Sequence, residues 1–167
     1  QILLTAKSTW GALHGVSTLR QLMSAEQIPS DAHIVDRPRF AWRGCMLDVA
    51  RHFVPLSRLF QLVDGLQLLK MNVLHLHLSD DQGFRFGSLA LPKLPSDEHY
   101  TIEQLRALVA YAADRGVRVV PELDVPGHVT HWLCAYPRWG SEEAEPSQRF
   151  GVHPGCLDPT REEVYSA

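Results

Sequence analysis

Residues 73–85 read VLHLHLSDDQGFR, and this stretch decides the fold class of the chain. Within it, His75 and His77 alternate with three leucines, and this period of two predicts a β-strand with both histidines on one face. The strand leads directly into the polar residues 79–82. In α/β proteins, polar residues at the carboxyl end of a buried strand are typical of a functional site.

Two more apolar runs, one on each side of this stretch, lead into polar residues in the same way. Upstream, residues 45–49 read CMLDV and are followed by Ala50, Arg51 and His52. Downstream, residues 117–123 read VRVVPEL and are followed by DVPGH. Short, mostly apolar runs of this kind predict strands of a parallel sheet that is covered on both faces.

Between the predicted strands, apolar residues recur at helical spacing. Ser57 is the expected N-cap of a first helix, whose apolar face runs from Leu59 to Leu69. Thr101 is the expected N-cap of a second helix, and Gly116 lies just past its end. The order β-α-β-α-β therefore predicts an α/β fold built on a parallel sheet.

The residues ahead of this unit predict a separate segment. Residues 9–23 have helical spacing, with Ser8 or Thr9 as N-cap, and residues 27–31 interrupt the pattern. Pro38 favours an extended connector. We place a domain boundary near residue 36, which divides the chain into residues 1–36 and 37–167.

Composition and charge narrow the class of protein. The chain has 167 residues, of which 45% are apolar and 21% charged, and a net charge of −3, so it is a globular sequence without a basic face for nucleic acid. No apolar run reaches the roughly 18–20 residues that cross a membrane. Residues 1–5 (QILLT) lack the pattern of a signal peptide and an initiator Met, so we expect a processed product, an engineered fragment or an excerpt of a longer polypeptide. The choice among these and the cellular compartment stay open.

The three cysteines do not form a disulfide scaffold or a metal-binding C-x-x-C motif. Cys45 lies in a predicted strand and is expected to be a small core residue. A disulfide between Cys134 and Cys156 stays an open alternative.

Candidate functional residues follow the three predicted strands. Arg51 is a suitable donor to hydroxyl or carboxylate groups, and a buried Asp48 needs a cationic or donor partner. Asp80 and Asp81 are adjacent, so we expect them to face different ways, with one of them toward the cleft. The Pro126-Gly127 turn is expected to present His128 to the cleft. For His75 and His77, a role as hydrogen-bonded interior residues and a functional role both stay open.

The motifs at these strand ends resemble those of the β-N-acetylhexosaminidases, family 20 of the glycoside hydrolases. The similar stretches are RGCMLDVARHF at residues 43–53, HLHLSDDQGFR at 75–85 and PELDVPGH at 121–128. Residues 12–22 (ALHGVSTLRQL) are similar to the end of the auxiliary α/β domain that precedes the catalytic barrel in this family. The resemblance covers almost the whole chain.

The resemblance implies a fold for both parts of the chain. Residues 1–36 are then the end of the auxiliary α/β domain and its linker, and residues 37–167 are the N-terminal part of a (β/α)8 TIM barrel with about three βα units. A complete barrel takes about 250 residues. Three strands cannot close a barrel, so their unpaired edges favour self-association.

The resemblance also implies a substrate and residue roles. The substrate is a carbohydrate with a terminal N-acetylhexosamine, and neither a cofactor nor a metal is needed. Arg51 holds sugar hydroxyls, and Asp80 and His128 form a dyad beside the catalytic acid. Asp48, His75, Asp81 and Asp124 have supporting positions. Hydrolysis is substrate-assisted, because the acetamido oxygen of the sugar attacks the anomeric carbon.

The catalytic Asp-Glu pair of this family is missing from the chain. None of its adjacent acidic pairs stands in the Gly-Gly-Asp-Glu setting that follows the fourth strand of the family; these pairs are Asp80-Asp81, Asp97-Glu98, Glu142-Glu143 and Glu162-Glu163. We therefore expect the chain alone to be inactive.

Two other functions stay open. One is a metal-dependent barrel hydrolase, since histidine and carboxylate side chains suit zinc; its candidate ligands are His75, His77, Asp80, Asp124 and His128. The other is a non-catalytic sugar-binding fragment that keeps Arg51 without the acid.

Overall fold

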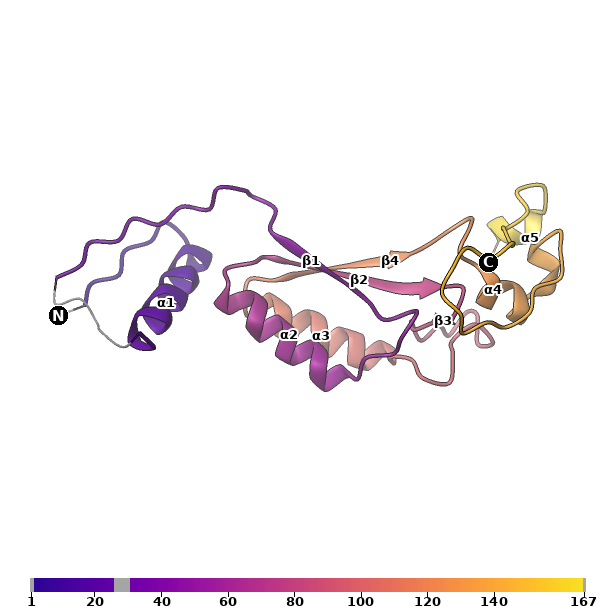
Figure 1. The fold of residues 1–167 in the computed structure, drawn as a ribbon, viewed down its shortest axis with the longest axis horizontal. Coiled ribbons are helices and arrows are strands. Elements are labelled where there is room, and N and C mark those ends of the chain that lie inside the picture. Colours follow the sequence, from indigo (N-terminus) through magenta and orange to yellow (C-terminus); the bar gives the residue numbers. More distant parts are fainter. Residues whose placement is uncertain (1, 26–30, 167) are drawn as a thin grey trace.

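The strand at residues 73–80 lies at the centre of the sheet. The computed structural model describes residues 2–25 and 31–166, and in it β2 (Val73–Asp80) pairs in parallel with β1 (Gly44–Asp48) and with β4 (Arg118–Leu123) (Figure 1). The register aligns Asp48, His77 and Glu122 in one row across the three strands. The predicted parallel β-α-β-α-β order is confirmed.

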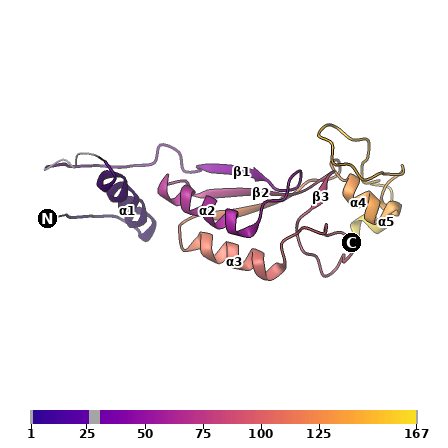
Figure 2. The ribbon, with the colours of Figure 1, turned by 60° about the horizontal axis from the view of Figure 1, so that its bottom comes forward.

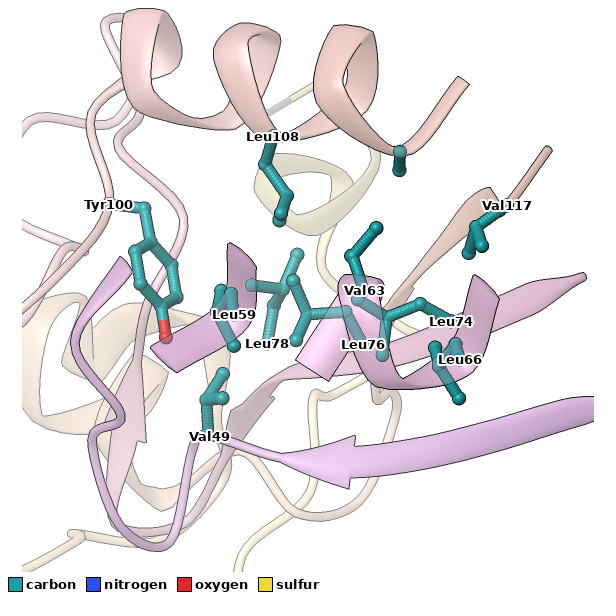
Figure 3. Packing of buried hydrophobic residues seen from close by; sticks show 11 residues of the cluster. Val49, Leu59, Val63, Leu66, Leu74, Leu76, Leu78, Tyr100, Leu108 and Val117 are labelled. Carbon is teal, nitrogen blue, oxygen red and sulfur yellow. The ribbon is translucent and has the colours of Figure 1, made fainter. Parts of the chain in front are cut away.

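Two helices cover one face of this sheet. The helices α2 (Leu56–Leu68) and α3 (Ile102–Ala113) lie side by side on it (Figure 2). The three leucines of β2 point to this face and pack against both helices, as Figure 3 shows. The buried cluster consists of Val49, Leu59, Val63, Leu66, Leu74, Leu76, Leu78, Tyr100, Leu108, Ala112 and Val117.

The expectation that helices cover both faces is wrong for the described residues. The opposite face of the sheet carries Met46, which is 55% exposed, and the half-buried His75 and Glu122. The physical reason is the alternation in β2, which places its leucines on the helix face and its histidines on the other. The predicted placement of both histidines on one face of this strand is therefore confirmed, and that face is the less apolar one.

The predicted N-cap of α3 is confirmed, and the predicted N-cap of α2 is wrong. Thr101 caps α3 with a full capping box, in which its side chain accepts from the Gln104 backbone and the Gln104 side chain accepts from the Thr101 backbone. The N-cap predicted at Ser57 is wrong, because α2 begins at Leu56 after Pro55. Proline has a φ close to helical values, so the helix starts early and Ser57 lies in its first turn. Gly116 follows α3 with a φ of +70°, as expected.

The segments after β2 and β4 contain several short elements. The strand β3 (Gly83–Phe84) forms an antiparallel hairpin with the end of β2. After β4, the chain forms α4 (Thr130–Ala135), a 3₁₀ turn at Pro137–Trp139 and α5 (Glu162–Tyr165). A second apolar cluster around α4 consists of Val129, Leu133, Trp139 and Leu157.

The first helix lies at the end of the molecule opposite to α4 and α5 (Figure 1). It is α1 (Thr9–Met23), and its N-cap Ser8 accepts from the Gly11 backbone. The buried Ser17 donates to the Gln67 carbonyl and so joins α1 to α2. The interruption predicted at residues 27–31 falls, apart from Asp31, outside the described residues. The boundary near residue 36 stays a prediction.

The structure shows the state of the three cysteines and the lengths of the helices. Cys45, Cys134 and Cys156 are all free thiols, so the alternative of a Cys134–Cys156 disulfide is wrong for this structure. Cys45 is half-buried against the main apolar cluster. Among the described residues, no helix combines the length and apolar character that crossing a membrane requires.

Replacing Leu76 by alanine should destabilise the chain by about 2–5 kcal/mol, because this side chain is fully buried between the sheet and α2. The measurement is urea unfolding followed by circular dichroism. Leu89→Ala is the control, since Leu89 is 87% exposed and should change the free energy of unfolding by less than about 0.5 kcal/mol. Equal effects of the two variants would contradict the assigned core.

Candidate functional site at the carboxyl end of the sheet

The three strands end at one edge of the sheet, and their polar side chains meet there. Asp48 and Arg51 come from the end of β1, and His77 and Asp80 from β2. His128 follows β4 and contacts Asp80. The prediction that these strand ends form one cluster is confirmed, and the cluster has the composition of an ion-pair network.

Arg51 is held by two carboxylates. One terminal nitrogen of its guanidinium lies 2.6 Å from Asp48 Oδ2, and the other lies 2.6 Å from Asp80 Oδ2. Burial raises the pKa of Asp48, but hydrogen bonds from the backbone and side chain of Arg51 lower it more, so the net direction is down. The Arg51 side chain is still 27% exposed, and its position is fixed before any ligand binds.

Asp80 is buried and has partners on both carboxylate oxygens. Oδ2 is bound by Arg51 and lies 2.9 Å from His77 Nε2. Oδ1 accepts from the Asp81 backbone at 2.7 Å and lies 3.2 Å from His128 Nδ1. The expected contact between Asp80 and His128 is therefore present. The His128 side chain is 39% exposed and has a positive φ of 57°, so the turn after β4 presents it at the rim.

Asp81 anchors the turn that carries His128. Its Oδ1 accepts from the Thr130 backbone at 3.0 Å and from the Thr130 hydroxyl at 2.6 Å. Its Oδ2 has no hydrogen bond and lies 3.4 Å from His128 Nδ1. The expectation that only one of the adjacent aspartates faces the site is wrong, because the hairpin to β3 bends the chain here and brings both carboxylates near His128.

Glu122 and His77 are central to the site, although neither was singled out over its neighbours. His77 is almost fully buried, with Nδ1 2.5 Å from Glu122 Oε1. His75, the residue expected in a supporting position, pairs with Glu122. The available signal was the strand register, because Asp48, His77 and Glu122 share one row of the sheet. Asp124, which follows Glu122 by two residues, donates its backbone N–H to Ser79 Oγ.

The buried Arg85 shapes the loop next to Arg51. Arg85 donates from Nε to the Val49 carbonyl at 3.0 Å and from a terminal nitrogen to the Ala50 carbonyl at 3.0 Å. Its other terminal nitrogen donates to the Glu98 carbonyl at 2.9 Å. Burial lowers the pKa of Arg85. Because Arg85 binds the two carbonyls directly before Arg51, it fixes the backbone from which Arg51 extends.

Two groups of side chains have the spacing of metal ligands. They are His77 with Asp80 and Asp124, and Asp80 and Asp81 with His128. Both groups need Asp80, and the Arg51 guanidinium already lies 2.6 Å from that carboxylate. A metal ion would have to displace this cation or lie beside it, so the charges favour an ion-pair cluster over a set of metal ligands.

Residues 40–167 match the family model described as "Glycosyl hydrolase family 20, catalytic domain". The chain is 35% identical to the β-hexosaminidase of Emericella nidulans over 97% of this chain and 30% of the relative. It is 42% identical to the β-hexosaminidase of Akkermansia muciniphila over 77% of this chain and 30% of the relative. It therefore spans about three tenths of the length of these curated relatives.

Solved structures are similar in fold as well as in sequence. The chitobiase of Flavobacterium johnsoniae superposes with a TM-score of 0.84 at 43% identity, over 93% of this chain and 25% of that one. A structure described as a glycoside hydrolase family 20 β-N-acetylglucosaminidase superposes with a TM-score of 0.88 at 36% identity, over 97% of this chain and 39% of that one.

Arg85→Lys should destabilise the chain by about 2–5 kcal/mol, because an ammonium group cannot reach all three buried carbonyls that the guanidinium binds. The measurement is thermal and urea unfolding. The matched control is Arg58→Lys on the exposed side of α2, which should leave stability within about 0.5 kcal/mol of the original. A stability loss as small as that of the control would show that Arg85 does not hold this loop.

Proposed function

Because the chain belongs to glycosyl hydrolase family 20, we propose that it forms part of a β-N-acetylhexosaminidase. In this proposal the cluster at the carboxyl ends of β1, β2 and β4 is one wall of a pocket for a terminal β-linked N-acetylhexosamine. The observation that carries the proposal is the position of Arg51, a partly exposed arginine whose side chain is fixed by two carboxylates at this edge.

Arg51 suits recognition of sugar hydroxyls for a physical reason. Asp48 and Asp80 each hold one terminal nitrogen of its guanidinium, so little side-chain entropy is lost when a ligand binds. A guanidinium has five N–H donors, so donors remain for a ligand, and the Arg51 side chain is 27% exposed. Charge-assisted hydrogen bonds from such a group contribute about 1.5–3 kcal/mol each.

Asp80 and His128 have a supporting role in this proposal. Asp80 lies against the Nδ1 side of the His128 ring, which leaves Nε2 free for another partner. A carboxylate on one ring nitrogen fixes the tautomer of an imidazole and raises its basicity. We assign the dyad the task of tuning the protonation of a catalytic acid that lies outside this chain, with Asp81 and Asp124 holding the surrounding turns.

The proposed fold of the complete domain is a (β/α)8 barrel. Three parallel strands with α2 and α3 on one face correspond to the first part of such a barrel, and the polar face of the sheet would face its interior. The match to the catalytic domain begins at residue 40, which supports a division near residue 36. Within the described residues β1 and β4 pair only with β2, and such open edges favour self-association.

The proposed mechanism is substrate-assisted and retaining. The acetamido oxygen of the substrate attacks the anomeric carbon, an aspartate orients the acetamido group, and a glutamic acid protonates the leaving oxygen. This chain contributes Arg51 and the Asp80–His128 dyad to that reaction. It does not contain the Asp-Glu pair, so the second candidate function, binding of the sugar without hydrolysis, applies to the 167 residues by themselves.

The purified 167-residue chain should not hydrolyse a chromogenic N-acetylglucosaminide. Without an acid over the glycosidic oxygen, the reaction loses the factor of about 10²–10⁴ that general acid catalysis contributes. The matched protein is an extended polypeptide, in which this chain continues through the rest of the family 20 catalytic domain, and it should be active. Turnover by the isolated chain, free of host enzymes, would contradict the assignment, and stoichiometric zinc in active protein would favour a metal-dependent hydrolase.

In the extended polypeptide, Arg51→Lys should lower kcat/KM by about tenfold to a few hundredfold. Lysine keeps the positive charge beside Asp48 and Asp80 but lacks the planar fork that binds several oxygens at once. Steady-state kinetics with the chromogenic substrate measure the effect. Arg58→Lys on α2 is the control and should be unchanged; if Arg51→Lys matches it, Arg51 does not bind the sugar.

A further inference from the structure

Glu122 connects two histidines on the face of the sheet opposite to α2 and α3. One carboxylate oxygen lies 2.5 Å from His77 Nδ1, and the other contacts His75 Nε2. The function proposed above assigns no role to this residue. Asp80 binds Arg51 directly, whereas Glu122 is connected to Asp80 through His77.

His77 has a carboxylate oxygen at each ring nitrogen. Nδ1 faces Glu122, and Nε2 lies 2.9 Å from Asp80 Oδ2. An ionised carboxylate only accepts hydrogen bonds, whereas a neutral imidazole has one N–H and one lone pair. In the neutral form, the lone pair would face one of the two carboxylates. Only the imidazolium donates to both, so the geometry favours a charged His77.

The side chain of His77 is only 4% exposed, so water cannot replace a missing partner. A buried group left without a hydrogen bond costs about 1–3 kcal/mol, and more when it is charged. Glu122 thus offsets the burial of a cation on one side of the ring, and Asp80 does so on the other. Removing the charge of Glu122 would leave His77 hydrogen-bonded to Asp80 alone, and Asp80 also binds Arg51.

We propose that Glu122 is a positioning residue: it holds His77 as an imidazolium that donates to Asp80, and it thereby orients Asp80 toward Arg51 and His128. The enzymatic consequence rests on the function proposed above, whereas the state of His77 does not. Glu122 acts through His77 and Asp80 and does not touch the sugar. His75 is its second anchor, since it binds the other carboxylate oxygen.

Most of the charged groups around His77 are carboxylates, and the one cation among them, Arg51, lies 3.4 Å from His77 Nε2 and opposes its protonation. His77 is faced by Asp48 and Arg51 from the β1 side, by Asp80 from its own strand, and by Glu122 and Asp124 from the β4 side. Burial alone lowers the pKa of His77, but the hydrogen bonds to Asp80 and Glu122 raise it more, so the net direction is up. The Glu122 pKa is lowered, mainly by its hydrogen bond to His77.

The direction of the pH dependence follows from these shifts. A histidine whose pKa is higher in the folded state stabilises the fold below its unfolded pKa of about 6.5. This stabilisation is lost as the pH rises through the higher, folded-state pKa. Without Glu122 the folded-state pKa falls, and the loss begins at lower pH.

The first test is NMR of the 167-residue chain labelled with ¹⁵N-histidine, with His77 assigned by comparison with His77→Gln. We expect two ring N–H signals for His77 at pH 7 and one in Glu122→Gln. Glu143→Gln makes the same chemical change on an exposed loop and should keep both signals. A neutral His77 in the unmodified chain, or an imidazolium that persists in Glu122→Gln, would overturn the proposal.

The second test uses the extended polypeptide and covers the case in which the variant of the shorter chain does not fold. We expect Glu122→Gln to lower kcat more than it raises KM and to move the alkaline limb of the kcat profile to lower pH. Glu143→Gln should leave the profile in place. A reduced melting temperature with an unmoved alkaline limb would reduce Glu122 to a structural role and overturn the proposal. If the unmodified extended polypeptide lacks hexosaminidase activity, the proposed function fails, and the NMR result still decides the state of His77.

Discussion

Parallel pairing of β2 with strands on both sides is the constraint on which the rest of the structure depends. It brings the carboxyl ends of β1, β2 and β4 to one edge, although these ends are far apart in the sequence. The same pairing places the leucines of β2 under α2 and α3 and the histidines on the opposite face. The two faces of β2 thus have different roles: its leucines stabilise the fold, and its histidines contact the charged side chains of the site.

The cluster at this edge shows how a small site accommodates several charges in partly buried positions. Asp48, Asp80 and Glu122 are negative, and Arg51 and a charged His77 lie between them. Each cation contacts two carboxylates, so every carboxylate has at least one direct partner. Such networks tolerate the loss of one member poorly, because the remaining charges are left buried without compensation. This is why the geometry of Arg51 depends on residues that do not contact a ligand.

The similarity to family 20 establishes the family of the chain, whereas the local geometry supports statements about individual residues. The family is established by a match over residues 40–167 and by relatives that cover nearly the whole chain. Substrate, mechanism and partners of the complete protein stay proposals, since the chain spans about three tenths of the length of these curated relatives. The local geometry adds the connection from Glu122 through His77 to Asp80, which a family assignment alone does not describe.

The sequence by itself determined the strands, the helices and their order, because periods of two and of 3.6 residues are local properties of the chain. It also determined that Arg51, Asp80 and His128 belong together, because parallel strands share one functional edge. The tertiary structure was needed to show that, among the described residues, one face of the sheet carries no helix and that both Asp80 and Asp81 approach His128. It alone gave Glu122 and His77 their central place, since neither has a sequence signal apart from the register of β2 with β4. The alternation of side chains fixes which face each residue occupies, but which residue of β4 lies beside His77 depends on how whole strands pack against α2 and α3.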